Sequence, residues 1–108
     1  MYRLMVAATL CAFLIAPAQA IESKTDRPGS DYTNFDISVP KGGLIVSTAT
    51  ICEARCKNDF RCVAWTLVDP GVQGPDARCW LKNSIPKARP CSFCTSGSFP
   101  QRSLTKSF

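Results

Sequence analysis

Residues 52–65 read CEARCKNDFRCVAW and residues 79–82 read CWLK, and these two stretches hold four of the seven cysteines in a chain of 108 residues. Cys52 and Cys56 are four positions apart, which places both of them on one face of a helix. We therefore predict a helix over 48–58. If both cysteines are bonded, that face of the helix points toward the rest of the protein.

Short strands are predicted on both sides of this helix. The apolar run CVAWTLV at 62–68 is typical of a strand covered on both faces. Thr50 and Glu53 fit a capping box at the start of the helix, with Thr48 as the alternative cap. Further strands are expected at 31–39 and 78–83 and a very short one at 44–46, whereas 21–30 is a polar lead-in and 95–108 is a frayed tail.

The first twenty residues have the features of a signal peptide. Arg3 gives a basic start, 4–16 is an apolar run, and Ala18-Gln19-Ala20 supplies small residues at the spacing of a cleavage site. The apolar run is too short for a membrane anchor, which needs about 20 residues. We therefore expect an exported product that begins near Ile21 and is secreted or periplasmic, without a membrane span.

Composition limits the classes of function that remain. The formal net charge is +5, which falls to +4 once Arg3 is removed with the signal peptide. This modest charge does not favour nucleic-acid binding. Six cysteines remain after cleavage, and an even number in a small exported chain predicts disulfide bonds. The six are Cys52, Cys56, Cys62, Cys79, Cys91 and Cys94.

Nothing in the sequence indicates an enzyme. The chain has no histidine, which excludes a Ser-His-Asp triad, a Cys-His pair and a histidine-ligated metal. Cys91-Ser92-Phe93-Cys94 has the spacing of a dithiol redox site, but Pro90 before it and polar residues after it favour a structural bridge. An intermolecular bond and a redox role are the alternatives. We predict no catalytic residue, no cofactor and no metal.

Strand alternation makes a prediction about the two tryptophans. If Cys62 and Cys79 face the helix, then Trp65, Trp80 and Lys82 lie on the opposite face of the sheet. On that face the rings form either a second small core or a partly exposed aromatic platform for a sugar or a partner side chain.

Basic residues form two groups that are candidates for partner binding. They are Arg55, Lys57 and Arg61 near the end of the helix, and Lys82, Lys87 and Arg89 near the last predicted strand. Such residues form either a solubilising surface or a patch for acidic glycans or an anionic protein face.

Taken together, these motifs resemble the PAN/Apple domain in its short bacterial form. The resemblance covers about 26 to 97 and depends on Asp31-Tyr32 followed by Phe35, on Cys52-x3-Cys56-x5-Cys62, and on Cys79-Trp80-Leu81-Lys82. It implies an α+β fold, in which a small disulfide-stapled antiparallel β-sheet packs around a single α-helix.

The resemblance also implies the pairs Cys52–Cys79 and Cys56–Cys62. Longer Apple domains tie their two ends together with a third bridge, but this chain has no cysteine between the signal peptide and Cys52. Cys91 and Cys94 therefore bond each other, stay reduced or bond another chain.

The predicted organisation is a signal peptide at 1–20, a PAN/Apple-like domain at 21–97 and a flexible tail at 98–108. The function implied by the resemblance is that of an exported, non-enzymatic module that mediates protein–protein or protein–carbohydrate contacts. The alternatives are a small accessory protein of the envelope without a soluble ligand, and a thiol-disulfide protein that uses the C-x2-C pair.

Overall fold

The computed structural model of the protein describes residues 21–39 and 43–105. The predicted signal peptide and most of the turn expected at 40–43 lie outside the described residues. The elements are β1 (Glu22–Asp26), β2 (Asp31–Ile37), α1 (Ile45–Lys57), β3 (Ala64–Val68), β4 (Ala77–Lys82), β5 (Arg89–Ser98) and α2 (Pro100–Thr105).

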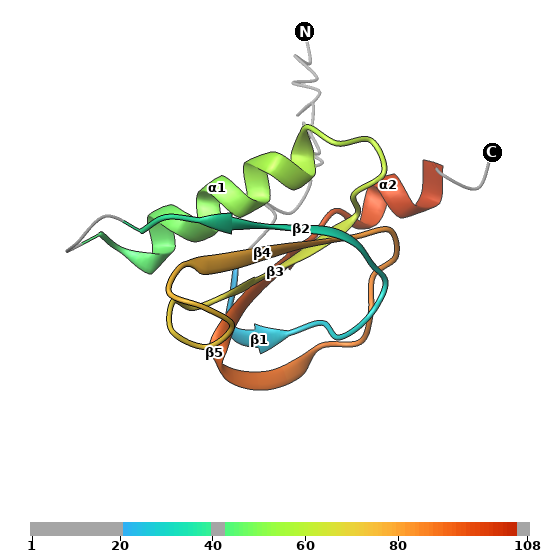
Figure 1. The fold of residues 1–108 in the computed structure, drawn as a ribbon. Helices are drawn as coiled ribbons and strands as arrows, with labels where there is room; N and C mark the ends of the chain where they lie inside the picture. The colour runs from blue at the N-terminus through green and yellow to red at the C-terminus, as the bar shows by residue number, and fades with distance from the viewer. Residues whose placement is uncertain (1–20, 40–42, 106–108) are drawn as a thin grey trace, which may run out of the picture.

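The strands form one antiparallel sheet in the order β1-β5-β3-β4-β2. The helix α1 lies across one face of this curved sheet, and β1 with the first part of β5 curls away on the other side (Figure 1). The predicted α+β class is therefore confirmed, with α2 as a short addition after the last strand.

Three disulfides join the elements. Cys52–Cys79, with sulfur atoms 2.09 Å apart, links α1 to β4, and Cys56–Cys62, at 2.07 Å, links the last turn of α1 to the residues before β3. These are the two pairs that the resemblance implies. The third pair, Cys91–Cys94, lies within β5, so the two cysteines whose partners the sequence left open are bonded to each other.

The core lies between α1 and the central strands β3 and β4. Across these strands Trp65 is opposite Leu81 and Leu67 is opposite Cys79. Directly opposed residues share a face of the sheet, and Cys79 is bonded to α1, so all four side chains face the helix. The predicted orientation of Trp80 and Lys82, away from the helix, is confirmed by the same register.

The predicted orientation of Trp65 is wrong. Trp65 faces the helix, belongs to the buried core and has 0% exposure, so it offers no platform to a ligand. The reason is that Cys62 lies before the first residue of β3, Ala64, in the turn that follows the helix. Strand alternation cannot be extended from Cys62 to Trp65 through residues that are not extended.

Gly97 allows the indole of Trp65 to lie flat against the sheet. Gly97 is the direct partner of Trp65 on β5. A β-carbon at position 97 would lie 2.6 Å from Nε1 of Trp65 and 2.7 Å from two carbons of the same ring. Glycine is needed here because the ring occupies the space of a side chain, whatever the backbone conformation.

The helix begins earlier than predicted. The strand expected at 44–46 does not form, because Leu44 is the N-cap residue and Ile45 is the first residue of α1. Thr48 does not cap the helix, since its hydroxyl donates back to the carbonyl of Leu44 at 3.4 Å. Ile45 packs against the core. Tertiary packing thus extends the helix toward the N-terminus, past the polar residues that were predicted to begin it.

The segments predicted as a polar lead-in and a frayed tail are strands of the sheet. Part of 21–30 forms β1, and the residues after Thr95 continue β5 to Ser98 between β1 and β3. A buried polar network joins these strands: the hydroxyls of Thr66 and Ser96 are 2.7 Å apart, and Ser96 donates to the carbonyl of Thr25 at 2.8 Å. The interior here is polar, so no hydrophobic alternation marked the strands.

The residues after β5 close the C-terminal end of α1. Arg102 of α2 donates to the carbonyl of Cys56 at 3.0 Å and to that of Cys62 at 3.3 Å, and also to the carbonyl of Lys57. A guanidinium satisfies several of the carbonyls left unpaired where a helix ends and suits the negative end of its dipole. Most of the predicted flexible tail is therefore structured, up to residue 105.

Replacing Arg102 should accordingly destabilise the domain. Arg102→Met removes the charged hydrogen bonds to the end of α1, and we expect it to lower the free energy of unfolding by about 1 to 2 kcal/mol. Urea denaturation measures the change. Arg102→Lys is the control, because it keeps the charge without the forked donors. Its free energy of unfolding should lie between those of the wild type and Arg102→Met. Unchanged stability in Arg102→Met would contradict this role of the C-terminal segment.

Candidate functional site

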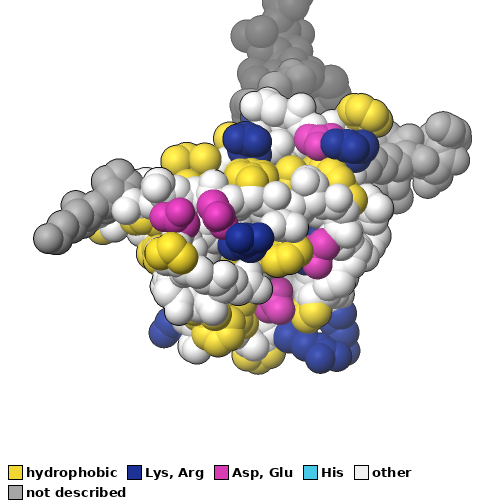
Figure 2. All heavy atoms as spheres, in the orientation of Figure 1, with side chains coloured by type: hydrophobic (Ala, Val, Ile, Leu, Met, Phe, Trp, Pro, Cys, Tyr) yellow, Lys and Arg dark blue, Asp and Glu magenta, His cyan; other side chains and the backbone are white. Residues whose placement is uncertain are grey.

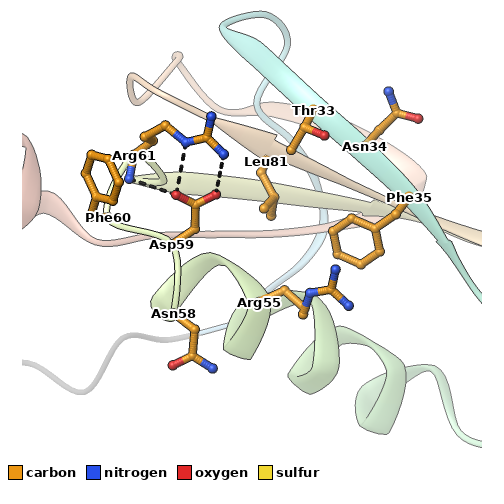
Figure 3. A pocket seen from close by; sticks show the side chains of 9 residues that line it. All are labelled: Thr33, Asn34, Phe35, Arg55, Asn58, Asp59, Phe60, Arg61 and Leu81. Atoms are coloured by element: carbon orange, nitrogen blue, oxygen red, sulfur yellow. Dashed lines mark hydrogen bonds and ion pairs between the residues drawn. The ribbon is translucent and has the colours of Figure 1, made fainter.

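An open hollow lies between the end of α1 and the strands β2 and β4. We call it the helix-side hollow; its volume is about 590 Å³. Figure 3 shows its side chains, which come from the helix, from the turn after it, from β2 and from β4; Phe35, Arg55 and Leu81 point into the space between helix and sheet, whereas the others lie around it or point outward. They are Thr33, Asn34, Phe35, Arg55, Asn58, Asp59, Phe60, Arg61 and Leu81.

Arg55 extends from the exposed side of α1 toward β2. Its guanidinium carbon lies 4.2 Å from the centre of the Phe35 ring, and the two side chains point toward each other in Figure 3. Stacking on an aromatic face holds an arginine without using its N–H groups. The guanidinium is thus fixed at the hollow with donors available to a ligand.

The turn after α1 is fixed by a compact ion pair. Asp59 accepts from the backbone N–H of Arg61 at 3.0 Å, and the two side chains form two further contacts at 3.1 and 3.2 Å. Phe60 lies between them in sequence and is directed outward, with 83% of its surface exposed. The turn therefore presents a large aromatic ring to solvent at the rim of the hollow (Figure 3).

The same contacts set the ionisation of this turn. Hydrogen bonds from the side chain and then the backbone of Arg61 lower the pKa of Asp59 from 3.8 to about 2. Arg61 also lies over the ring of Tyr32, 4.8 Å from its centre. Burial, and then the neighbouring Asp59 carboxylate, raise the pKa of Tyr32 above its ordinary value. At neutral pH Asp59 in the turn is ionised and the neighbouring Tyr32 of β2 is neutral.

The lowered pKa of Asp59 predicts a loss of stability in acid. A carboxyl group with a lower pKa in the folded state stabilises that state fully above its unfolded value, and the contribution disappears as the pH falls through the folded value. We expect Asp59→Asn to lower the melting temperature at pH 6, and the difference from the wild type to shrink between about pH 4 and pH 2. Thermal unfolding of both proteins across this range measures it. A difference that is constant with pH would contradict the assignment.

The structure brings together only some of the residues predicted to bind a partner. Arg55 and Arg61 line the helix-side hollow, whereas Lys57 is exposed on α1 outside it. Lys87 and Arg89 are exposed where the chain enters β5. Basic and acidic side chains are interspersed over most of the face in Figure 2. The predicted basic residues therefore do not form one continuous patch.

Trp80 and Lys82 contribute to a different hollow, on the face of the sheet opposite α1. We call it the sheet-side hollow; its volume is about 350 Å³. Gln73, in the loop before β4, accepts a hydrogen bond from the indole of Trp80, and Lys82 and Thr66 make the floor of the hollow polar. The hollow is lined by Asp26, Pro28, Gly29, Asp31, Thr66, Val68, Gln73, Trp80, Lys82, Phe93 and Cys94.

Phe60 was missed by the sequence reasoning. It is a large apolar residue in a polar segment, between the helix end at Asn58 and the half-cystine Cys62. A bulky aromatic residue in a short turn between two half-cystines has little chance of reaching the core. That position could have marked Phe60 as an exposed binding residue.

Free thiols, metal-binding clusters and membrane-spanning helices are not found among the described residues. Each of the six cysteines in 21–39 and 43–105 is in a disulfide, so this part of the chain holds no free thiol. Within the same ranges no three His, Cys, Asp or Glu side chains gather in a way that could hold a metal ion. None of the helices described there is both long and apolar enough to cross a bilayer.

The comparisons with known proteins identify the family. The family model of the PAN domain matches residues 25–82, which is more than half of the chain and includes every residue that lines the helix-side hollow. No curated protein and no solved structure gives a significant match. PAN domains are in general non-catalytic modules that bind protein or carbohydrate. The match, the sheet with its single long helix and the disulfides agree, and the chain belongs to the PAN domain family.

Proposed function

We propose that the protein is an exported, non-enzymatic binding module that holds an anionic protein or carbohydrate partner in the helix-side hollow. The observation that carries the proposal is the pairing of Arg55, stacked and without a carboxylate partner in the described residues, with Phe60, which is 83% exposed. One supplies charge and directed donors, and the other supplies apolar contact area.

The charge of the hollow favours an anion. Arg55 and Arg61 face one carboxylate, Asp59, and the chain as a whole carries a formal charge of +5. Arginine binds carboxylate, sulfate and phosphate groups through parallel N–H donors.

The exposure of Phe60 favours a partner-binding surface over a surface that only increases solubility. A large ring with most of its area in water is unfavourable unless a partner covers it, and exposed aromatic residues beside arginines are typical of the residues that dominate binding energy. The ion pair of the turn holds Phe60 in position before binding, which reduces the entropy lost on association.

Export is supported by the disulfides. Three intramolecular bonds in a small domain fit an oxidising compartment such as the periplasm or the extracellular medium. The signal-like character of 1–20 agrees with this location. We therefore place the proposed partner outside the cytoplasm.

The proposal is tested by binding to acidic probes. Dextran sulfate and polyglutamate represent the anionic carbohydrate and the anionic protein, and unmodified dextran is the neutral control. We expect Arg55→Ala and Phe60→Ala each to weaken binding of at least one acidic probe about tenfold, which corresponds to about 1.4 kcal/mol. Isothermal titration calorimetry at 0.15 M salt measures the affinities.

Lys57→Ala is the matched control, because it removes the same charge from the same helix end outside the hollow. We expect it to change the affinity less than twofold. Equal losses in Arg55→Ala and Lys57→Ala would mean that the probes follow net charge alone, and this would contradict the hollow as the site. Absence of binding to both acidic probes would contradict the anionic partner.

A further inference from the structure

The sheet-side hollow is built from five parts of the chain. The connection between β1 and β2 forms one side, the loop between β3 and β4 forms another, and β5 forms a third, while β3 and β4 supply the floor. Its volume of about 350 Å³ lies at the small end of the range of ligand pockets, about 300 to 1,000 Å³.

Lys82 brings a buried charge to the floor of this hollow. Its side chain is 2% exposed, and its ammonium group donates to Oδ1 of Asp31 at 2.5 Å and to the carbonyl of Gly29 at 3.1 Å. An ammonium group has three donors. The third has no acceptor among the described residues, and a buried donor is costly to leave unpaired. Lys82 can therefore offer a hydrogen bond to a ligand.

Two aromatic side chains line the hollow. The indole N–H of Trp80 donates to Oε1 of Gln73 at 2.8 Å, which fixes the orientation of a partly exposed ring. Gln73 is positioned in turn by a short loop that the backbone bond from Gly71 to Gly74 closes at 2.7 Å. Phe93, with 44% of its surface exposed, also lines the hollow.

The disulfide Cys91–Cys94 shapes the strand that carries Phe93. On β1, Ser23 pairs with Thr95 and Thr25 pairs with Pro90, so four residues of β5 bulge out between these two pairs. The disulfide spans this bulge. The carbonyl of Phe93 also accepts from the backbone N–H of Asp69 at 2.9 Å. A bond that closes only a short loop thus fixes one wall of the hollow.

The charges of the hollow select the class of ligand. The carboxylates of Asp26 and Asp31 disfavour binding of an anion, and the ammonium of Lys82 disfavours binding of a cation. A neutral polyol suits both, because each hydroxyl can donate to a carboxylate and accept from the ammonium, while its C–H face packs on an aromatic ring. From this geometry we propose that the sheet-side hollow is a second binding site, which takes a neutral saccharide independently of the helix-side hollow.

The two tryptophans give a direct test. Trp80 lines the sheet-side hollow, whereas Trp65 is buried on the helix side of the sheet, and the chain contains no other tryptophan. Titration of the ¹⁵N-labelled protein with cellotetraose, mannotetraose and chitotetraose should move the indole N–H resonance of Trp80 for at least one sugar and leave that of Trp65 unchanged. Tetralysine and dextran sulfate are titrated in parallel.

Variants assign the effect to the site. We expect Phe93→Ala and Asp26→Asn each to weaken sugar binding at least fivefold, whereas Phe60→Ala, which alters the helix-side hollow, should change it less than twofold. A Trp80 resonance that moves only with tetralysine would overturn the saccharide in favour of a cationic ligand. No movement with any of the sugars, or equal movement of both indole resonances, would overturn the site itself, and neither result bears on binding of acidic probes to the helix-side hollow.

Discussion

Replacing Cys52 and Cys79 together with alanine should lower the free energy of unfolding by about 3.6 kcal/mol, because the bond closes a loop of 28 residues that the unfolded chain would otherwise explore freely. Both cysteines are fully buried between α1 and β4. The total free energy of unfolding of a small domain is about 5 to 15 kcal/mol. The loss is therefore large enough to leave much of the exported protein unfolded and open to proteolysis.

Urea denaturation and limited proteolysis of the double variant measure the effect. The control is Cys91→Ala with Cys94→Ala, which removes a bond over a sequence separation of only 3 and should cost the least of the three disulfides. A Cys52→Ala/Cys79→Ala protein that resists protease as well as the wild type would show that the core between helix and sheet does not need this bond.

Gly97→Ala should destabilise the domain by about 3 kcal/mol. The added methyl group would lie 2.6 Å from Nε1 of Trp65, a distance at which one of the two must move. Trp65 is fully buried against α1 and β4 and cannot swing outward, so the cost falls on the packing of the whole core. Thermal and urea unfolding measure the loss.

Ser98→Ala, one position farther along β5, is the control and should change the stability by less than about 0.5 kcal/mol. A double-mutant cycle identifies the cause. Trp65→Leu is costly by itself, but Gly97→Ala should cost much less in its presence because the indole atoms that the methyl group meets are gone. If Gly97→Ala costs the same in both backgrounds, contact with the ring is not the reason for the glycine.

The elements that could be predicted are those whose local pattern agrees with their environment. The helix around Cys52 and Cys56, the strand with Cys79 and the orientation of Trp80 away from the helix follow from spacing and alternation, and the structure has all three. The pairings came from the resemblance to PAN domains, since six cysteines alone allow many connectivities.

The elements that could not be predicted depend on contacts between distant segments. β1 and the second half of β5 are polar strands, so their sequences resemble loops. The hydroxyl of Ser96 on β5 bonds the hydroxyl of Thr66 on β3 and donates to the backbone carbonyl of Thr25 on β1. The orientation of Trp65 depends on where the turn after Cys62 ends, which the strand pattern does not contain. Arg102 looks like part of a charged tail until the end of α1 is placed beside it.

The candidate site was predicted in part for the same reason. Arg55 and Arg61 were found because basic residues near a helix end can be recognised in the sequence. The sequence does not show that the sheet separates them from Trp80 and Lys82. Phe60 was overlooked because an isolated aromatic residue is ordinarily assigned to the core. The ion pair between its two neighbours directs it outward.

Chemical-shift mapping with a short acidic ligand tests the proposed function most directly. We predict that titration of the ¹⁵N-labelled protein with hexaglutamate or a sulfated oligosaccharide moves the backbone resonances of 33–35 and 55–61 most strongly, around the helix-side hollow. Shifts concentrated instead around Lys87 and Arg89, or spread evenly over all basic residues, would contradict the assignment of partner binding to this hollow.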